Sequence, residues 1–380
     1  MKVLFILNSL AKGGAERFVI DLCNELLTRN DISFKLLVLE EKNEYEYLTK
    51  NLTYTVLGGP YVPSLSKKVN FDSSVYKDIV EQFQPDIIHT NLFQSEIYSS
   101  LYVNNQICYV THGHNNMIEF KKFNHKTLFT KSLITNFFEK QLLYFRKYGK
   151  SKNCYFIANS IDTFNYYDKN LPRRIRGNLQ LIQYGFDFNR FNNPNRAAEI
   201  PAGKLKLINI GRFAIYKNQQ FLIGIAQELR DRKIEFEMNL FGLGAEKEKI
   251  QLLVNNLDLQ KSVFLRGNVD NVEQWLNEGH IYLHSAYYEP FGLVLLEAMA
   301  SGLPCIILNG KGNADLVLNG KNGYIFEEQN PHLFADKIEQ LRTDASLYSE
   351  LSKNAQEFAS RFAIGPKTDE LIEFYQSLLS

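Results

Sequence analysis

Residues 281–308 read IYLHSAYYEPFGLVLLEAMASGLPCIIL. The apolar run at 281–284 predicts a strand, the segment LVLLEAMA at 293–300 predicts a helix, and the run at 304–308 predicts a second strand. The Gly-Leu-Pro that separates the helix from the second strand is typical of a helix end. A strand, a helix and a strand in direct succession indicate a parallel sheet covered by helices.

The same alternation extends along the chain in both directions. Apolar runs predict further strands at 3–7, 34–39, 87–89, 107–111, 154–158, 205–210, 236–241, 263–265 and 323–326. Residues 189–203 interrupt the alternation, because they are rich in Asn, Pro and Ala and have no apolar periodicity, and we interpret them as a linker. We therefore expect an α/β protein with two facing, doubly wound, Rossmann-like domains at 1–188 and 204–365. A C-terminal helix at 366–380 should cross back to the first domain, and the cleft between the domains is the expected ligand site.

The composition is that of a globular protein. Of the 380 residues, 45% are hydrophobic and 22% are charged, which excludes a disordered chain, a collagen and a coiled coil. The formal net charge of +1 gives no reason to expect a nucleic-acid partner. The four cysteines form no Cys-x-x-Cys pair, so we expect reduced thiols and no zinc. No run approaches the ~20 apolar residues of a membrane span, and the run at 3–7 is too short for a signal peptide. We expect a cytoplasmic protein.

Two glutamates flank the start of the 293–300 helix. Glu289 lies in the loop before it and Glu297 lies within it. Backbone N–H groups of the first helical turn favour an anion, and Glu297 lies roughly 7.5 Å further on at ~1.5 Å per residue. That is similar to the reach from a diphosphate to the ribose of its nucleotide. The alternative is two solvated carboxylates, although an unpaired carboxylate would be costly in the apolar run around Glu297.

Two cations, Arg212 and Lys217, follow the strand at 205–210. At the end of a parallel strand they could neutralise a diphosphate, Arg212 through paired hydrogen bonds and Lys217 as a point charge. Two ordinary surface cations are equally compatible with this spacing.

Two glycine-rich turns also follow predicted strands. Gly13 and Gly14 open a helix, where backbone N–H groups can hold a phosphate. A tight turn without a ligand is the alternative. Gly242 and Gly244 begin like a dinucleotide fingerprint, but Lys247 takes the place of the third glycine. An NAD-dependent dehydrogenase is therefore not supported.

Together these segments resemble the family-4 retaining glycosyltransferases of the GT-B fold. The motifs that carry the resemblance are GGAER at 13–17, GRFAIYK at 211–217, the Gly-x-Gly turn, and EPFGLVLLEAMASGLP at 289–304. Weaker matches are NS at 159–160, YGFD at 184–187 and DLV…G…NGY at 315–324. The order and spacing follow the family over nearly the whole chain. Asp315 and Asn91 depart from the family pattern, which has Glu and frequently His there.

The resemblance implies a donor site in the second domain. Glu289 would contact hydroxyls of the donor sugar together with backbone N–H groups of Phe291, Gly292 and Leu293. Glu297 would bind the ribose. Arg212 and Lys217 would hold the diphosphate.

The resemblance also implies that the first domain binds the acceptor. Gly13 and Gly14 would approach the diphosphate, and His112 would lie beside the donor sugar. His112 and His114 alone are a poor metal site because no third ligand accompanies them, and the family is metal-independent.

The implied function is transfer of a hexose from a nucleotide diphosphate sugar to a saccharide or lipid-linked saccharide, with retention of configuration. A UDP-sugar is favoured over GDP-mannose, and bacterial surface polysaccharide synthesis (capsule or O-antigen) is the expected setting. No cofactor is expected besides the nucleotide-sugar co-substrate. Front-face attack assisted by the leaving diphosphate is favoured over a covalent Glu289 intermediate. The alternatives are a nucleotide-sugar epimerase of the same fold and a non-catalytic subunit of a polysaccharide assembly complex.

Residues 120–150 suggest a peripheral membrane contact. This segment holds eight Lys and Arg residues with Glu139 as its only acidic residue, and aromatic residues are interleaved with the cations. Its helical spacing predicts that part of the segment packs on the first domain through apolar residues, namely Leu133, Phe137, Phe138, Leu142 and Phe145. The cations would then face anionic lipids at the inner face of the cell membrane, where lipid-linked acceptors reside. A merely solvated basic face is the alternative.

Overall fold

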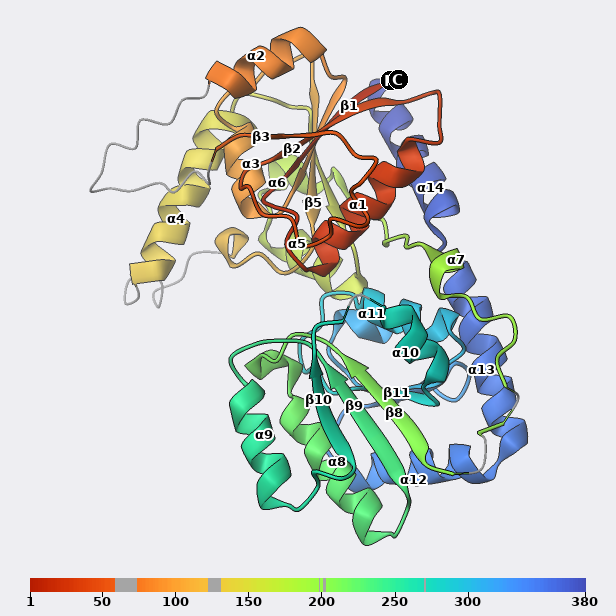
Figure 1. The fold of residues 1–380 in the computed structure, drawn as a ribbon. Helices are drawn as coiled ribbons and strands as arrows, with labels where there is room; N and C mark the ends of the chain where they lie inside the picture. The colour runs from red at the N-terminus through yellow and green to blue at the C-terminus, as the bar shows by residue number, and fades with distance from the viewer. Residues whose placement is uncertain (59–73, 122–130, 198, 201–202, 270) are drawn as a thin grey trace. The chain divides into compact units, whose positions relative to one another are not determined.

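The computed structural model describes residues 1–58, 74–121, 131–197, 199–200, 203–269 and 271–380, and it divides into two compact units. The first unit comprises Met1–Gly185 together with Ile364–Ser380, and the second comprises Phe186–Ala363 (Figure 1). Each unit is an α/β layer structure.

The first unit is built on a seven-stranded sheet in the order β3-β2-β1-β4-β5-β6-β7, and all of its strand pairs are parallel. The strands are β1 (Lys2–Leu7), β2 (Ser33–Val38), β3 (Tyr54–Val56), β4 (Ile87–Asn91), β5 (Cys108–Gly113), β6 (Cys154–Ala158) and β7 (Leu179–Leu181). Apart from the exposed Lys2, the central strands β1, β4 and β5 are buried along their whole length, which is why their sequences are rich in apolar residues.

Helices cover both faces of this sheet. They are α1 (Gly14–Leu26), α2 (Ser74–Phe83), α3 (Phe93–Ser99), η1 (Ile118–Phe120), α4 (Lys131–Leu143), the π-helix η3 (Tyr144–Tyr148), α5 (Ile161–Asn170), α6 (Arg173–Arg176) and α14 (Ile364–Leu379). The last helix, α14, begins at Ile364 and lies against α1, where Arg29 donates a hydrogen bond to the Gly365 carbonyl at 3.2 Å and pairs with Asp369 (Figure 1).

The second unit has a six-stranded parallel sheet in the order β10-β9-β8-β11-β12-β13. Its strands are β8 (Leu205–Ile210), β9 (Phe236–Phe241), β10 (Val263–Gly267), β11 (Ile281–His284), β12 (Cys305–Leu308) and β13 (Gly323–Phe326). Its helices are α7 (Phe188–Phe191), η4 (Ile215–Lys217), α8 (Gln219–Asp231), α9 (Lys247–Asn256), α10 (Val272–Glu278), α11 (Leu293–Ala300), η5 (Gly312–Asp315), α12 (Pro331–Thr343) and α13 (Ala345–Ser360).

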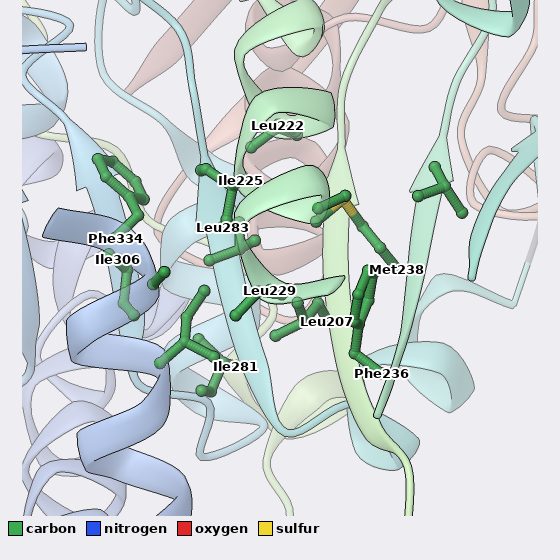
Figure 2. Close-up of a cluster of buried hydrophobic side chains, with 14 of the residues drawn as sticks. Leu207, Leu222, Ile225, Leu229, Phe236, Met238, Ile281, Leu283, Ile306 and Phe334 are labelled. Carbon is green, nitrogen blue, oxygen red and sulfur yellow. The ribbon is translucent and has the colours of Figure 1, made fainter. Parts of the chain in front are cut away.

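The core of the second unit lies between this sheet and helices α8 and α12 (Figure 2). Helix α8 points Leu222, Ile225 and Leu229 at the sheet, where they meet strand residues such as Met238 and Leu283. These positions repeat at the spacing of one helical face. Burial of each such side chain stabilises the unit by about 1.5–3 kcal/mol. The resulting rigid sheet holds the loops at the carboxyl ends of its strands.

Residues expected to form a linker belong instead to the second unit. Phe191 in α7 is buried, and its carbonyl accepts a hydrogen bond from Ser301 at 3.0 Å. Arg196 donates to the carbonyls of Gly279 at 2.5 Å and Asn277 at 3.1 Å. The described part of 189–203 is thus attached through polar contacts to backbone carbonyls. Such contacts leave no apolar periodicity, which explains why the sequence pattern resembled a linker.

Candidate functional site

Glu289 is held in the loop between β11 and α11 by backbone bonds. Its N–H donates to the carbonyl of Gly310 at 2.8 Å, and Glu289 forms an isolated parallel bridge with Lys311. Only 8% of the residue is exposed. The loops after β11 and β12 therefore support one another at the carboxyl edge of the sheet.

The Glu289 carboxylate meets a cation and an imidazole. Lys217 Nζ bonds to Oε2 of Glu289, and His284 Nε2 lies 3.1 Å from the same oxygen. Burial alone would raise the pKa of Glu289, but the Lys217 charge and the His284 side chain outweigh it and lower that pKa to about 2. Burial lowers the pKa of His284, and Glu289 only partly offsets this. At neutral pH, Glu289 is therefore a carboxylate and His284 is uncharged.

The loop after β12 requires small residues beneath Glu289. A Cβ at Gly312 would lie 1.9 Å from the Pro290 carbonyl oxygen, so glycine is needed there. Asn313 is fully buried; its Oδ1 accepts from the Gly310 N–H at 2.8 Å and its Nδ2 donates to the Leu308 carbonyl at 3.1 Å. Sequence reasoning identified neither this loop nor His284. A histidine at the strand end just before Glu289 is the signal that could have found the latter.

Helix α11 begins directly after the loop that follows β11 and holds Glu289. Gly292 precedes its first residue with a φ of 103°, a left-handed conformation that favours glycine. Phe291 and Leu293 are buried on either side of it, and Glu297 is half-buried within the helix. The helix start and Glu289 are thus parts of one rigid loop–helix unit, with the positive end of the helix dipole beside it.

The Arg212 and Lys217 loop follows β8, which pairs with β11. Lys217 forms an ion pair with Glu289, whereas the Arg212 side chain is exposed at the end of the strand. Two further hydrogen bonds join this loop to the one after β11: the Tyr287 N–H donates to the Tyr216 carbonyl at 3.1 Å, and the Ser285 hydroxyl donates to the Lys217 carbonyl at 2.8 Å.

The Gly-x-Gly turn after β9 supports this loop. A Cβ at Gly242 would lie 2.1 Å from the Gly211 carbonyl oxygen, and one at Gly244 would lie 2.1 Å from that of Phe213. Both glycines are therefore required by close backbone packing. This favours the structural interpretation of the Gly-x-Gly turn over a dinucleotide site.

The remaining predicted site residues lie in the first unit. Gly13 precedes α1 in an extended conformation, and Gly14 is its exposed first residue. A Cβ at Gly14 would meet nothing within 4 Å, so packing does not require glycine there. His112 is fully buried in β5, with its ring stacked on that of His114 at 4.3 Å. Among the described residues, no group of three or more His, Cys, Asp or Glu could hold a metal ion.

The described part of residues 120–150 departs from the expected packing. Phe138 is 49% exposed and Phe145 is 77% exposed, so the prediction that they pack in the core was wrong. Lys147 is instead buried and bonds to Glu96 at 2.8 Å, so it is not one of the surface cations. Residues 122–130, which hold two of the eight cations of this segment (Lys122 and Lys126), lie outside the described residues. No helix within the described parts of the chain is long and apolar enough to cross a membrane.

Solved structures share this fold over nearly the whole chain. The Anabaena protein HepE, solved in complex with UDP and glucose, superposes with a TM-score of 0.77 at 20% identity, covering 99% of this chain and 100% of that one. The two parallel, Rossmann-like sheets and this structural match together show that the chain has the GT-B fold. More particularly, residues 192–358, which make up most of the second unit, match the family model "Glycosyl transferases group 1".

Proteins that are similar in sequence also carry glycosyltransferase names. The putative glycosyltransferase EpsF of Bacillus subtilis is 27% identical over 80% of this chain and 78% of its own length. The poly(glycerol-phosphate) alpha-glucosyltransferase of the same organism is 28% identical over 43% of this chain. The chain spans only 24% of the length of that relative.

Proposed function

We propose that the chain is a retaining glycosyltransferase that moves a hexose from a nucleotide diphosphate sugar to a saccharide or lipid-linked saccharide. The observation that carries this proposal is the ionised Glu289, held by Lys217 beside the start of α11. A fixed carboxylate suits sugar hydroxyls, and a cation with a helix N-terminus suits a diphosphate. The family match over residues 192–358 supports the same reaction.

The donor is proposed to be a UDP-sugar and the setting bacterial surface polysaccharide synthesis. The HepE complex with UDP and glucose supports the first point. A relative named for poly(glycerol-phosphate) glucosylation supports the second. In this proposal Glu297 binds the ribose, and the backbone N–H groups of Phe291, Gly292 and Leu293 assist Glu289.

The proposed mechanism uses the leaving diphosphate rather than a protein nucleophile. Negative charge develops on the diphosphate as the glycosidic bond breaks, and Lys217, Arg212 and the α11 dipole would stabilise it. A carboxylate with a pKa of about 2 is a weak base, and its pairing with Lys217 makes it a poor nucleophile. In this proposal Glu289 orients the sugar, and no metal takes part in the reaction.

A screen of nucleotide sugars for slow hydrolysis tests this function, because hydrolysis needs no acceptor. We expect release of UDP from at least one UDP-hexose, and loss of that release in Glu289→Gln. Conversion of the sugar without nucleotide release would instead indicate an epimerase.

We also propose that the face formed by α4 and η3 contacts an anionic membrane. Phe138 and Phe145 are two helical turns apart and both are exposed, so they lie on one face. Lys121 and Lys150 are exposed in the same segment. A segment that exposes both aromatic side chains and cations has the chemistry of an interfacial contact with anionic lipid.

A further inference from the structure

Three histidine rings gather at the carboxyl ends of β4 and β5. His89 and His112 have ring centroids 5.3 Å apart, and His114 stacks on the other side of His112. Burial lowers the pKa of His89 to about 3, and burial likewise lowers the pKa values of His112 and His114 well below their ordinary value. Each ring is therefore neutral, with one N–H donor and one bare acceptor nitrogen. Hydrogen-bond partners decide which nitrogen holds the proton.

Tyr375 on helix α14 stands at the start of a hydrogen-bond chain. Its hydroxyl bonds to Nδ1 of His89, and burial raises the pKa of Tyr375 well above its ordinary value, so the hydroxyl keeps its hydrogen. When Tyr375 donates, Nδ1 of His89 accepts and the proton of His89 sits on Nε2. This Nε2 lies 3.3 Å from Nδ1 of His112 and donates to it. The proton of His112 is then on its own Nε2.

Hydrogen bonds donated in the opposite direction, from His112 through His89 to Tyr375, are less favourable. They would leave two buried groups unpaired, namely the hydroxyl hydrogen of Tyr375 and the bare Nε2 of His112. Donation from Tyr375 leaves only one buried group unpaired, the Nε2–H of His112. This nitrogen is buried and has no hydrogen-bond partner among the described residues. An unpaired buried N–H costs free energy, and an oxygen acceptor brought to it would remove that cost.

His114 provides the contrast. Its Nε2 lies 2.8 Å from Oδ1 of Asn91, and its Nδ1 bonds to the Tyr184 hydroxyl. The amide of Asn91 donates to the Ile6 carbonyl at 3.2 Å, which leaves Oδ1 as the acceptor. Both nitrogens of His114 are thus satisfied within the protein, whereas His112 has a donor to spare.

We propose that Tyr375 is a positioning residue, which sets the tautomer of His112 through His89 so that His112 presents an Nε2–H donor to an oxygen of the bound sugar. The tautomer is inferred from hydrogen bonds within the first unit alone. The identification of the ligand as a bound sugar rests on the proposed function.

Nitrogen-15 NMR of the full chain labelled at histidine tests the tautomer directly. We expect His112, identified by the cross-peak lost in His112→Gln, to show a protonated Nε2 and a bare Nδ1. In Tyr375→Phe this pattern should shift toward a mixture of tautomers, because His89 has lost its donor. The matched control Tyr184→Phe should alter the signals of His114 and leave the tautomer of His112 unchanged, because Tyr184 bonds to His114 and not to His112.

Two results would overturn the proposal: a proton on Nδ1 of His112 in the unsubstituted protein, or an unchanged His112 pattern in folded Tyr375→Phe. The first needs no variant, so a folding failure leaves the test intact. Donor hydrolysis by Tyr375→Phe should fall about five- to tenfold in kcat with KM nearly unchanged. A shifted tautomer with unchanged kcat would remove the proposed role of His112 and leave the action of Tyr375 on the tautomer standing.

Discussion

Lys217 and Glu289 form an ion pair across 72 residues of sequence, with their side chains only 16% and 10% exposed. The pair joins the loop after β8 to the loop after β11. Its two members are also the proposed contacts for diphosphate and sugar. A bound donor would therefore meet a site whose charges already hold each other in place, which limits the reorganisation that catalysis requires.

Removing one partner of this pair should destabilise the second unit. Lys217→Met leaves a buried carboxylate without its cation, which typically costs about 3–5 kcal/mol. Lys206→Met is the control, because the pair of Lys206 with Glu278 is exposed (39% and 61%) and should contribute no more than ~1 kcal/mol. Urea unfolding measures both. Equal losses of unfolding free energy would contradict the buried-pair interpretation.

The same pair makes stability depend on acid. The folded-state pKa of Glu289 is about 2, below the value of roughly 4.3 for an unfolded glutamate. Its contribution, on the order of 3 kcal/mol, is present above pH ~4.3 and is lost as the pH falls toward 2. Unfolding free energy measured between these pH values should fall less steeply in Glu289→Gln than in the unsubstituted protein. If the unfolding free energies of the two proteins changed equally with pH, the pKa of Glu289 would be the same in the folded and unfolded states.

Glu289→Gln should separate turnover from nucleotide binding. We expect sugar transfer or donor hydrolysis to fall by about 10²-fold or more, while UDP still binds, because Glu289 is proposed to contact the sugar and not the phosphates. Calorimetry with UDP, on protein shown to be folded by circular dichroism, provides the binding value. Near-normal turnover would remove the central claim about the site.

Arg212→Ala should weaken binding of UDP far more than binding of uridine. Loss of a charge-assisted phosphate contact typically costs about 1.5–3 kcal/mol. Arg230→Ala is a suitable control, since Arg230 lies near the C-terminal end of α8, whereas Arg212 precedes this helix, and Arg230 pairs with Asp231. If both ligands lose the same affinity in Arg212→Ala, the residue only supports the fold.

The exposed face of α4 and η3 should bind anionic vesicles. We expect salt-sensitive binding to phosphatidylglycerol vesicles, weakened in Phe145→Ser and in the double variant Lys121→Gln/Lys150→Gln, with donor hydrolysis unchanged. Each cation near such a surface contributes about 1 kcal/mol. Leu252→Ser, at a side chain 59% exposed on α9 of the second unit, is the control. Absence of binding, or binding that ignores both salt and these variants, would favour a solvated face.

Much of the fold was predictable because buried parallel strands read as apolar runs. The strands missed were the edge strands β3 and β7, each three residues long with mostly half-buried or exposed side chains. Short edge strands bury too little to leave an apolar run.

The site was predictable only in part. Glu289 and Lys217 stood out by their position after strands, but nothing in the sequence indicates that they pair, because pairing is set by the neighbouring positions of β8 and β11 in the sheet. The burial of Lys147 could not be foreseen for a similar reason, since its partner Glu96 lies 51 residues earlier. Helical spacing at Phe138 and Phe145 identified a face, but not whether anything covers it.

Helix α14 follows the whole second unit in the chain, yet it belongs to the same unit as Met1. The first unit therefore cannot be completed during its own translation: its sheet must wait, with the surface of α1 uncovered, until the whole second unit has been made. A chain that stops at residue 363 would lack both Arg29's partner Asp369 and the hydroxyl of Tyr375. Such a product would be incomplete in the unit that contains its beginning, although the break lies near its end.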